Sequence, residues 1–380
     1  MDGFACVVMK ILLIAPYYTG SHAAWAKGYA RYSQHQVDIL SLPGRYWKWR
    51  MHGGAVTLAR QFLASSLTPD LILTTDMLDL TTFMALTRHR TAHIPTAIYF
   101  HENQLTYPWS PTDRDIAQRR EKHYGFINFV SALTADTVLF NSRYHQDSFL
   151  TALPQLLKHF PDYNELDSVQ RIRDKSRVLA LGLDLQRFDP FRPNQPPEKP
   201  LLLWGHRWEF DKNPKEFFRA LTILSEQGVD FNLAVLGENF KQQPKLFLNA
   251  QKRLARHMVQ FGYVDSFTKY AQWLWRADII PVTSHQDFFG ASVVEALYCH
   301  CFPLLPKRLA YPDIIPIKNH ADCFYEDFDD LVARLHKAIV NIEQTRQRNL
   351  RSVVAGYDWQ EQSQQYDALF LKLATDQSKL

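Results

Sequence analysis

The stretch Asp287-Phe288-Phe289-Gly290-Ala291-Ser292-Val293-Val294-Glu295-Ala296-Leu297 decides the fold. An apolar strand at residues 277–282 runs into it, and its glycine marks the start of a predicted helix. The first turn of a helix leaves backbone N–H groups without intrahelical partners and therefore attracts anions. Asp287 and Glu295, eight positions apart, could then hold hydroxyl groups at either end of a bound diphosphate. An ordinary amphipathic helix after a strand gives the same pattern.

Length and composition limit the class of protein. A chain of 380 residues is too long for one typical core and predicts about two domains, and 46% hydrophobic residues fit a packed globular protein. The net charge of +4 permits a phosphate-rich partner without requiring one. The apolar N-terminus is interrupted by Lys10 and lacks a small-residue cleavage site, so a buried strand is expected there, with Met1 or Met9 as the start. No apolar run approaches a membrane span, and we expect a cytoplasmic protein.

Metal ligands are not expected from the sequence. The four cysteines are Cys6, Cys299, Cys301 and Cys323. Cys299-His300-Cys301 could in principle bind a metal, but the sequence has no second pair of ligands at the spacing of a zinc finger. Buried reduced thiols explain these residues better.

The N-terminal part alternates apolar strands with helices, which predicts a parallel sheet covered on both faces. Strands are expected at 7–15, 37–40, 70–74, 96–100 and 137–140, and helices at 23–32, 56–65, 78–88 and 114–133. A further helix should begin at Asn141-Ser142, which are good N-cap residues. Loops at the carboxyl ends of such strands carry ligands, and Gly20 lies in the first of them.

A proline-rich segment separates the two halves of the chain. Residues 189–200 contain five prolines, and the pattern restarts after them. Strands are then expected at 201–205, 231–237, 279–282 and 302–305, and helices at 214–226, 290–297 and 359–373. We therefore predict an α/β protein with doubly wound domains at 1–188 and 201–355, a linker at 189–200, and a last helix within 356–380. Two such domains imply a cleft between them.

Two polar loops follow predicted strands. Arg207 and Lys212, after Gly205, combine a forked guanidinium with a point charge, which suits a diphosphate. A solvated loop with two incidental cations would look the same. His101-Glu102-Asn103 follows another strand, where the side chains could be acid–base groups or sugar ligands, or could form a structural turn.

Cations and aromatic residues alternate in Trp47-Lys48-Trp49-Arg50. The surrounding residues 42–52 contain no acid, which suits phosphate contacts and base stacking. A second basic cluster at 114–123 is diluted by acids, and a charged helix face explains it equally well.

Together these residues resemble the retaining, two-domain glycosyltransferases of the GT-B type, family-4-like. The family signature is an acid, seven residues and a glutamate, which Asp287 and Glu295 match, with aspartate where glutamate is usual. Arg207 and Lys212 have the five-residue spacing of the family's phosphate-binding pair. Residues 181–188 look like the segment that ends the N-terminal domain, and residues 358–370 look like the helix that crosses back to it.

The N-terminal half is similar to the tRNA-queuosine α-mannosyltransferase family. The motifs that carry this resemblance are Gly20-Ser21-His22 with Trp25, Leu42-Pro43 with Trp47-Lys48-Trp49-Arg50, Thr75-Asp76-Met77-Leu78-Asp79-Leu80, Phe100-His101-Glu102-Asn103-Gln104 and Phe140-Asn141-Ser142. The resemblance implies transfer of mannose from GDP-mannose to the cyclopentenediol of queuosine in the anticodon of aspartate tRNA. Because aspartate is one methylene shorter than glutamate, Asp287 leaves the donor sugar open.

The expected roles follow from these motifs. We expect His101, Asp287, Arg207 and Lys212 to act in catalysis, and Gly20, Gly205, Arg207, Lys212, Phe289, Gly290, Ala291 and Glu295 to bind the donor. For the tRNA we expect Ser21, His22, Trp47, Lys48, Trp49, Arg50, Glu102 and Asn103. The resemblance implies GDP-mannose and queuosine-containing tRNA as partners, and we expect no metal and no membrane. A small-molecule or lipid-linked acceptor, or a sugar-binding protein without catalysis, are the alternatives.

Overall fold

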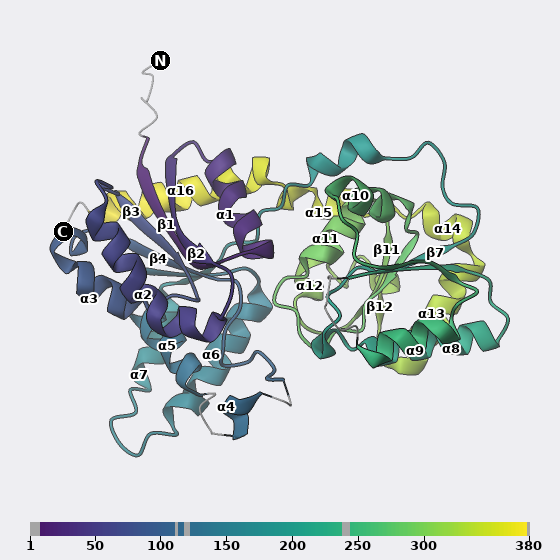
Figure 1. The fold of residues 1–380 in the computed structure, drawn as a ribbon, viewed down its shortest axis with the longest axis horizontal. Coiled ribbons are helices and arrows are strands. Elements are labelled where there is room, and N and C mark those ends of the chain that lie inside the picture. The colour runs from purple at the N-terminus through teal and green to yellow at the C-terminus, as the bar shows by residue number, and fades with distance from the viewer. Residues whose placement is uncertain (1–7, 111–112, 118–121, 238–243, 378–380) are drawn as a thin grey trace. The chain divides into compact units, whose positions relative to one another are not determined.

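The computed structural model describes residues 8–110, 113–117, 122–237 and 244–377 (Figure 1). Its internal contacts divide the chain into two compact units. Unit 1 comprises Met1–Leu183 and Trp359–Leu380, and unit 2 comprises Asp184–Asp358. The chain therefore leaves unit 1 once, builds unit 2, and returns to unit 1 with its last helix.

Unit 1 is built on a six-stranded parallel sheet. Its strands are β1 (Lys10–Tyr18), β2 (Gln36–Pro43), β3 (Leu71–Thr75), β4 (Thr96–Phe100), β5 (Thr137–Phe140) and β6 (Ser176–Val178). The order across the sheet is β2-β1-β3-β4-β5-β6, and every neighbouring pair is parallel. The helices are α1 (Gly20–Tyr32), α2 (Trp47–Ala64), α3 (Leu80–Thr91), α4 (Arg114–Ala117), α5 (Lys122–Thr134), α6 (Arg143–Leu157), α7 (Asp167–Asp174) and α16 (Trp359–Gln377).

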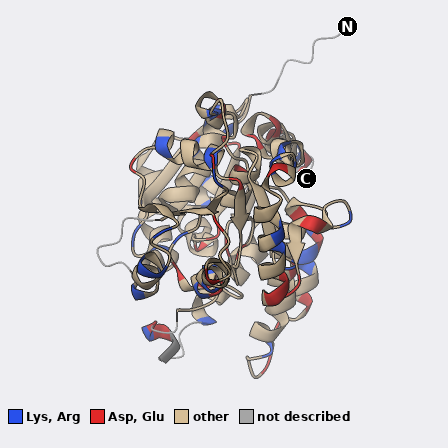
Figure 2. Ribbon diagram, turned by 90° about the vertical axis from the view of Figure 1, so that its right-hand side faces the viewer, with Lys and Arg blue, Asp and Glu red and all other residues tan. Residues whose placement is uncertain are grey.

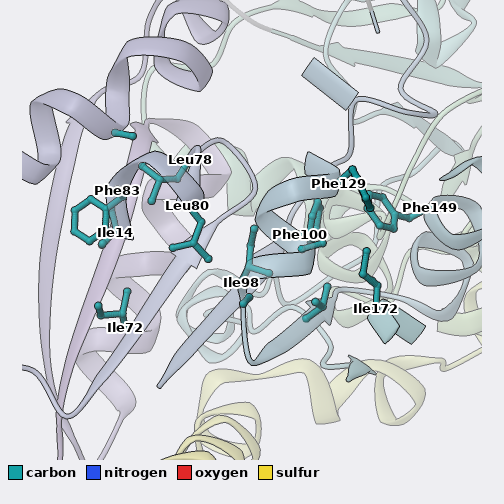
Figure 3. Packing of buried hydrophobic residues seen from close by; sticks show 14 of the residues in the cluster. Ile14, Ile72, Leu78, Leu80, Phe83, Ile98, Phe100, Phe129, Phe149 and Ile172 are labelled. Carbon is teal, nitrogen blue, oxygen red and sulfur yellow. The ribbon is translucent and has the colours of Figure 1, made fainter. Parts of the chain in front are cut away.

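The two faces of this sheet have different aromatic contacts because successive strand residues point to opposite sides. On one face, Ile72, Ile98 and Phe100 belong to one core cluster with Phe83 of α3 and Phe149 of α6 (Figure 3). On the other face, the ring of Tyr99 lies 4.7 Å from that of Trp25 in α1 and 5.9 Å from that of Tyr366 in α16. Helices on both faces bury the sheet, as the apolar strands predict.

The last helix, α16, is anchored in unit 1 by its first residue and by two polar side chains. The indole of Trp359 lies so close to Gly28 and Gly182 that an added Cβ would meet it at 2.0 Å and 2.4 Å, respectively. Tyr366 accepts a hydrogen bond from the indole of Trp25, and Asp367 accepts one from the hydroxyl of Tyr29. These contacts fix α16 on α1.

Unit 2 repeats the architecture with a second six-stranded parallel sheet. Its strands are β7 (Leu201–Trp204), β8 (Asn232–Leu236), β9 (Met258–Gly262), β10 (Ile279–Pro281), β11 (Phe302–Pro306) and β12 (Phe324–Tyr325), in the order β12-β11-β10-β7-β8-β9. The helices are α8 (Pro214–Glu226), α9 (Lys245–Arg253), α10 (Phe267–Arg276), α11 (Ala291–Tyr298), α12 (Tyr311–Ile314), α13 (Phe328–Val340), α14 (Ile342–Arg346) and α15 (Arg351–Val354). Short 3-10 turns cover Gln186–Phe191, Phe210–Lys212, Ala321–Cys323 and Ala355–Tyr357.

The proline-rich segment groups with unit 2. The carboxylate of Asp358 accepts hydrogen bonds from the backbone N–H groups of Leu185 and Gln186, and Arg346 donates to the carbonyl of Pro197. The first residues after the unit boundary are therefore tied to the last residue before the chain returns to unit 1.

Several element bounds agree with the sequence, and others need correction. The strands at 96–100 and 137–140 and the helix at 214–226 have the predicted bounds, and Ser142 caps α6 as expected. The helix predicted at 56–65 instead begins at Trp47. The indole of Trp49 packs against Gly53 and fills the space that a side chain would otherwise occupy at this position. The single helix predicted at 114–133 consists of α4 and α5, with residues 118–121 outside the described part.

Charges of both signs are interspersed along the ribbon (Figure 2). Within the described residues, no helix has the length and apolarity that a membrane crossing needs. Three of the cysteines, Cys299, Cys301 and Cys323, are buried free thiols, and Cys6 lies outside the described residues.

Candidate active site

The loop after β7 carries both predicted phosphate-binding cations. Arg207 is exposed, and its Nη1 lies 3.1 Å from Oε1 of Glu209. Lys212 is buried at the end of the same loop, where its Nζ donates to the carbonyl of Gln286 at 2.7 Å. The loop thus exposes Arg207 to solvent and holds Lys212 against the segment that follows β10.

Asp287 is fixed from two sides. Its Oδ2 lies 3.5 Å from Nζ of Lys212 and accepts a hydrogen bond from the hydroxyl of Tyr311 at 3.1 Å. Asp211 shares the ammonium of Lys212 at 3.4 Å. The structure therefore brings Lys212 and Asp287 together, as the sequence predicts for two parts of one site.

The N-terminus of α11 follows at once. Gly290 has φ of +91°, a left-handed conformation that side chains other than glycine rarely adopt. Among the described residues no side chain caps this helix end, and its first turn, which begins at Ala291, contains no acid. Phe289 is buried and packs edge-on against Tyr357 at 5.3 Å between ring centroids. The N–H groups of Val293 and Val294 donate to the carbonyl of Gly290, whereas those of Ala291 and Ser292 have no partner among the described residues and can bind an anion.

Glu295 lies further along α11 and is half-buried. Its Oε2 accepts a hydrogen bond from the hydroxyl of Tyr270 at 2.7 Å. Burial raises the pKa of Glu295, while the Tyr270 hydroxyl and the Arg187 guanidinium oppose that shift. Tyr270 also lines a cavity of about 320 Å³ together with Gly205, so the hydroxyl that binds Glu295 belongs to a residue of the cavity wall.

This cavity connects the loop after β7 with the loop after β9. Its lining residues are Gly205, His206, Arg207, Leu236, Gly237, Tyr263, Val264, Asp265, Ser266, Phe267 and Tyr270. They end a strand, follow one or lie in the first turns of the next helix, which is where open parallel sheets bind ligands. The mixture of aromatic walls and a cation suits a nucleotide.

His206 is buried beneath this loop and was not singled out from the sequence. Its Nδ1 lies 3.1 Å from the hydroxyl of Ser292 in the first turn of α11. Burial and the neighbouring Lys212 lower the pKa of His206 to about 4. The imidazole is therefore neutral at physiological pH and adds no charge to the site.

In unit 1, the corresponding edge begins with Gly20, whose φ is +49°. Ser21 and His22 form the first turn of α1, which lacks a side-chain cap and an acid. The His22 ring lies 4.5 Å from that of His101, and the indole of Trp25 meets His101 edge-on at 4.6 Å. Gly20, Ser21, His22 and His101 thus lie at one edge of the unit 1 sheet.

His101 is held by its backbone rather than by its ring. Its N–H donates to Oδ1 of Asp76 at 2.9 Å, and its carbonyl accepts from the amide of Asn141 at 3.0 Å. No described residue pairs with Nε2 of His101. Burial, followed by the neighbouring His22 and His145, lowers the pKa of His101 well below its usual range. The ring is a neutral group with one ring nitrogen unused.

The next two residues serve different purposes. Glu102 is half-buried, and its Oε1 accepts from the side-chain amide of Gln104 at 3.0 Å. Asn103 is fully buried, and its Oδ1 accepts the backbone N–H groups of Leu105 and Thr106. Asn103 therefore stabilises the turn, which was the alternative explanation for this segment.

The basic aromatic segment is divided by the first turns of α2. Trp47 is half-buried against Trp109 and Tyr124, and Nζ of Lys48 lies 2.6 Å from Asp113 and 2.5 Å from Asp115. Both carboxylates already neutralise the Lys48 ammonium, so its charge is not free for phosphate.

The neighbouring residues on α2 face outwards. Trp49 is 62% exposed, and Tyr46, which the sequence did not single out, is 72% exposed. Nε of Arg50 donates to the carbonyl of Pro43. The exposed aromatic surface is therefore formed by Tyr46 and Trp49.

Sequence reasoning missed the tyrosines of the site. Tyr270 and Tyr311 bind the two acids of the signature through their hydroxyls, yet both lie in helices where an aromatic residue reads as core. His206 directly precedes Arg207 in the loop after β7, and this position next to a predicted phosphate-binding residue was the signal that could have found it. Among the residues described, no cluster of His, Cys, Asp or Glu has the make-up of a metal site.

Comparison with known proteins places the chain in a family. Residues 10–183 match the family model described as tRNA-queuosine alpha-mannosyltransferase N-terminal, and residues 186–316 match Glycosyl transferases group 1. The tRNA-queuosine alpha-mannosyltransferase of Drosophila melanogaster is 34% identical over 83% of this chain and 84% of its own length. A GDP-mannose-dependent alpha-(1-6)-phosphatidylinositol dimannoside mannosyltransferase of Mycobacterium tuberculosis is 24% identical over 78% of this chain and 72% of its own length.

The fold has known relatives among solved structures. A sucrose-phosphate synthase from Thermosynechococcus elongatus superposes with a TM-score of 0.71 at 14% identity, covering 97% of this chain and all of that one. This likeness confirms the predicted GT-B class with two Rossmann-like units. Since the similarity to the Drosophila protein extends over both units, the chain belongs to the tRNA-queuosine alpha-mannosyltransferase family.

Proposed function

We propose that this protein transfers mannose, with retention of configuration, from GDP-mannose to the cyclopentenediol of queuosine in the anticodon of aspartate tRNA. The observation that carries the proposal is the 34% identity to the Drosophila tRNA-queuosine alpha-mannosyltransferase over 83% of the chain. The charges and helix ends of unit 2 support a nucleotide-sugar donor, and the exposed aromatic residues of unit 1 support an RNA acceptor.

The donor would bind along the carboxyl edge of the unit 2 sheet. Arg207 and Lys212, with the N–H groups of Ala291 and Ser292 at the start of α11, would provide counter-charge for a diphosphate. Glu295 would accept the ribose hydroxyls, because its carboxylate is oriented by Tyr270 at the end of the cavity. The name of the mycobacterial relative, which depends on GDP-mannose, favours this donor.

The cavity also favours guanine as the base. Asp265 is one of its lining residues, and its carboxylate pairs with Lys269 at 2.9 Å. A carboxylate can accept both the ring N–H and the amino group of guanine, whereas uracil presents no such pair of donors. A donor preference for GDP over UDP sugars is therefore expected.

The chemistry would be a front-side displacement. The bond from the anomeric carbon to the phosphate oxygen breaks as the bond to the acceptor oxygen forms on the same face, and the leaving phosphate takes the proton of the acceptor hydroxyl. Arg207 and Lys212 stabilise the charge that develops on the phosphate, so the proposal uses no metal. Asp287 and the neutral His101 would orient the sugar.

The acceptor would bind to unit 1 around the start of α2. Tyr46 and Trp49 are the exposed stacking groups, with Arg45 exposed beside them. The chain has no acid between Asp38 and Asp70, and the two acids that approach this face, Asp113 and Asp115, are paired with Lys48. Aromatic side chains that stack on unpaired bases are the usual means of binding an RNA loop.

Radiolabelled GDP-mannose offered to queuosine-containing and queuosine-free tRNA tests donor and acceptor together. We expect mannose to enter only the queuosine-containing tRNA, and we expect UDP- and ADP-sugars to be poor donors. Incorporation into both tRNAs, or into neither, would contradict the acceptor assignment. Because the mycobacterial relative is named for a phosphatidylinositol acceptor, a parallel reaction with phosphatidylinositol vesicles measures that alternative.

A further inference from the structure

Asp287 has a partner that the family signature does not include. The hydroxyl of Tyr311 donates to Oδ2 of Asp287 at 3.1 Å, and the tyrosine side chain is fully buried. Tyr311 begins α12, which follows the neighbouring strand β11. The acid and its partner are therefore supplied by consecutive strand-to-helix segments of unit 2.

The phenol of Tyr311 can act only as a donor to this acid. Burial, followed by the adjacent Asp287 charge, raises the pKa of Tyr311 well above its usual range, so the hydroxyl keeps its proton. The same carboxylate oxygen faces Nζ of Lys212 at 3.5 Å. One oxygen of Asp287 therefore has two partners: the uncharged hydroxyl of Tyr311, which donates a hydrogen bond, and the ammonium of Lys212, which forms an ion pair.

The ring of Tyr311 also supports the start of α11. A Cβ added to Gly290 would lie 3.2 Å from the ring edge of Tyr311 and 3.2 Å from Ile314. Gly290 has the left-handed conformation and directly precedes the first turn of α11. The Tyr311 ring therefore packs against the residue at which the predicted anion-binding turn begins. One side chain contacts both the predicted phosphate site and the predicted sugar-orienting acid.

We propose that Tyr311 is a positioning residue for the donor sugar: it holds one oxygen of Asp287 so that the other oxygen faces the mannose. The inference rests on the proposed function for the identity of the sugar. Without the hydroxyl, Lys212 alone would hold the carboxylate, and the acid could turn towards the ammonium and away from the sugar. An aspartate, one methylene shorter than glutamate, depends on such support because it reaches less far.

The test compares two buried tyrosine hydroxyls of the same unit. Tyr311→Phe removes the donor to Asp287, and Tyr325→Phe removes a donor to the carbonyl of Val282 at 2.7 Å, from a side chain that is 3% exposed. We expect Tyr311→Phe to lower kcat about tenfold, the scale of a lost hydrogen bond to a charged group, with little change in binding of GDP alone. Tyr325→Phe should leave kcat near that of the wild type. It should lower the melting temperature by about as much as Tyr311→Phe does.

A double-mutant comparison separates positioning from general stability. In an Asp287→Ala background, adding Tyr311→Phe should change kcat less than twofold, because the hydroxyl then has no side-chain oxygen to hold. Equal kcat losses in Tyr311→Phe and Tyr325→Phe, or a full tenfold loss from Tyr311→Phe on top of Asp287→Ala, would overturn the inference.

A second readout does not depend on transfer. The wild type should bind GDP-mannose and GDP with different dissociation constants, and Tyr311→Phe, but not Tyr325→Phe, should reduce that difference. If the wild-type protein transfers no mannose to any tRNA, the proposed acceptor fails, and this binding comparison still decides the role of Tyr311. An unchanged difference in Tyr311→Phe contradicts it.

Discussion

The two sheet edges begin alike and end differently. In each unit a helix starts at a glycine with positive φ and has no side-chain cap, Gly20 in unit 1 and Gly290 in unit 2. Around Gly290 stand ionised groups, with Lys212 on Asp287 and Arg207 on Glu209. Around Gly20 stand aromatic and imidazole rings, with His22, Trp25 and His101 in contact. The same backbone device is thus surrounded by charged groups in one unit and by aromatic and imidazole rings in the other.

The largest expected effect lies on the charged edge. Arg207→Ala should lower kcat about a hundredfold or more, because loss of one charge-stabilising group costs about 2.7–4 kcal/mol of barrier. Initial rates with GDP-mannose and queuosine-containing tRNA measure this. Arg276→Ala, which removes another exposed arginine of unit 2, should be nearly neutral. Equal rates in the two variants would remove Arg207 from the mechanism and break the contrast between the edges.

The second test concerns the ribose end of the donor. Glu295→Gln should raise KM for GDP-mannose about tenfold or more, since a hydrogen bond to a charged group is lost while Tyr270 keeps an acceptor. KM for tRNA should stay within about twofold of the wild-type value on the same argument. A variant whose two KM values rise together would show that Glu295 supports the fold of unit 2 and not the donor alone.

The third test addresses the aromatic edge. Trp49→Ala should raise KM for tRNA about tenfold, because stacking of a base on an aromatic side chain contributes about 1–3 kcal/mol. Val56→Ala, which alters a 54% exposed apolar residue of the same helix, is the matched control. If KM for GDP-mannose rose in Trp49→Ala while tRNA binding stayed the same, the proposed division of labour between the units would be wrong.

The smallest effect is a pH dependence of stability. Burial and Lys212 hold the pKa of His206 at about 4 in the folded protein, whereas an unfolded chain takes up this proton near pH 6.5. The unfolded state therefore binds more protons between these values, and stability falls as the pH is lowered through this window. His206 contributes a slope of up to about 1.4 kcal/mol per pH unit.

Chemical denaturation of wild type and His206→Gln between pH 7 and pH 5 measures this slope. The variant should lose less stability on acidification than the wild type does. Parallel curves would mean that the imidazole of His206 is not neutral in the folded protein, and the unit 2 edge would then carry one more cation than described.

Much of the fold is legible from local patterns. Apolar runs of four or five residues between turn signals predicted β4 and β5, and the proline after Asn213 predicted the start of α8. The short strands β6 and β12 escaped prediction because they contain two or three residues, too few for a period to show. The start of α2 was misplaced because Gly53 weakens a helix locally, although the indole of Trp49, one turn earlier in the same helix, packs against this glycine.

The site divides in the same way. Spacing in the chain singled out Asp287 with Glu295 and Arg207 with Lys212, because each pair lies in one loop-and-helix segment with fixed geometry. It could not show that Lys48 is neutralised by Asp113 and Asp115, 65 and 67 residues away. Ion pairs of that separation depend on which loops the fold brings together.

The sequence by itself determined the class of fold, the two acids, the two cations and the family, since periodicity and motif spacing are local properties of the chain. Only the tertiary structure decided what each group touches. It assigned Tyr270 to Glu295 and Tyr311 to Asp287, and it left Tyr46 and Trp49 as the exposed aromatic residues at the start of α2. The physical reason is that hydrogen-bond partners and burial arise when separate strand-to-helix loops meet at one edge of a sheet.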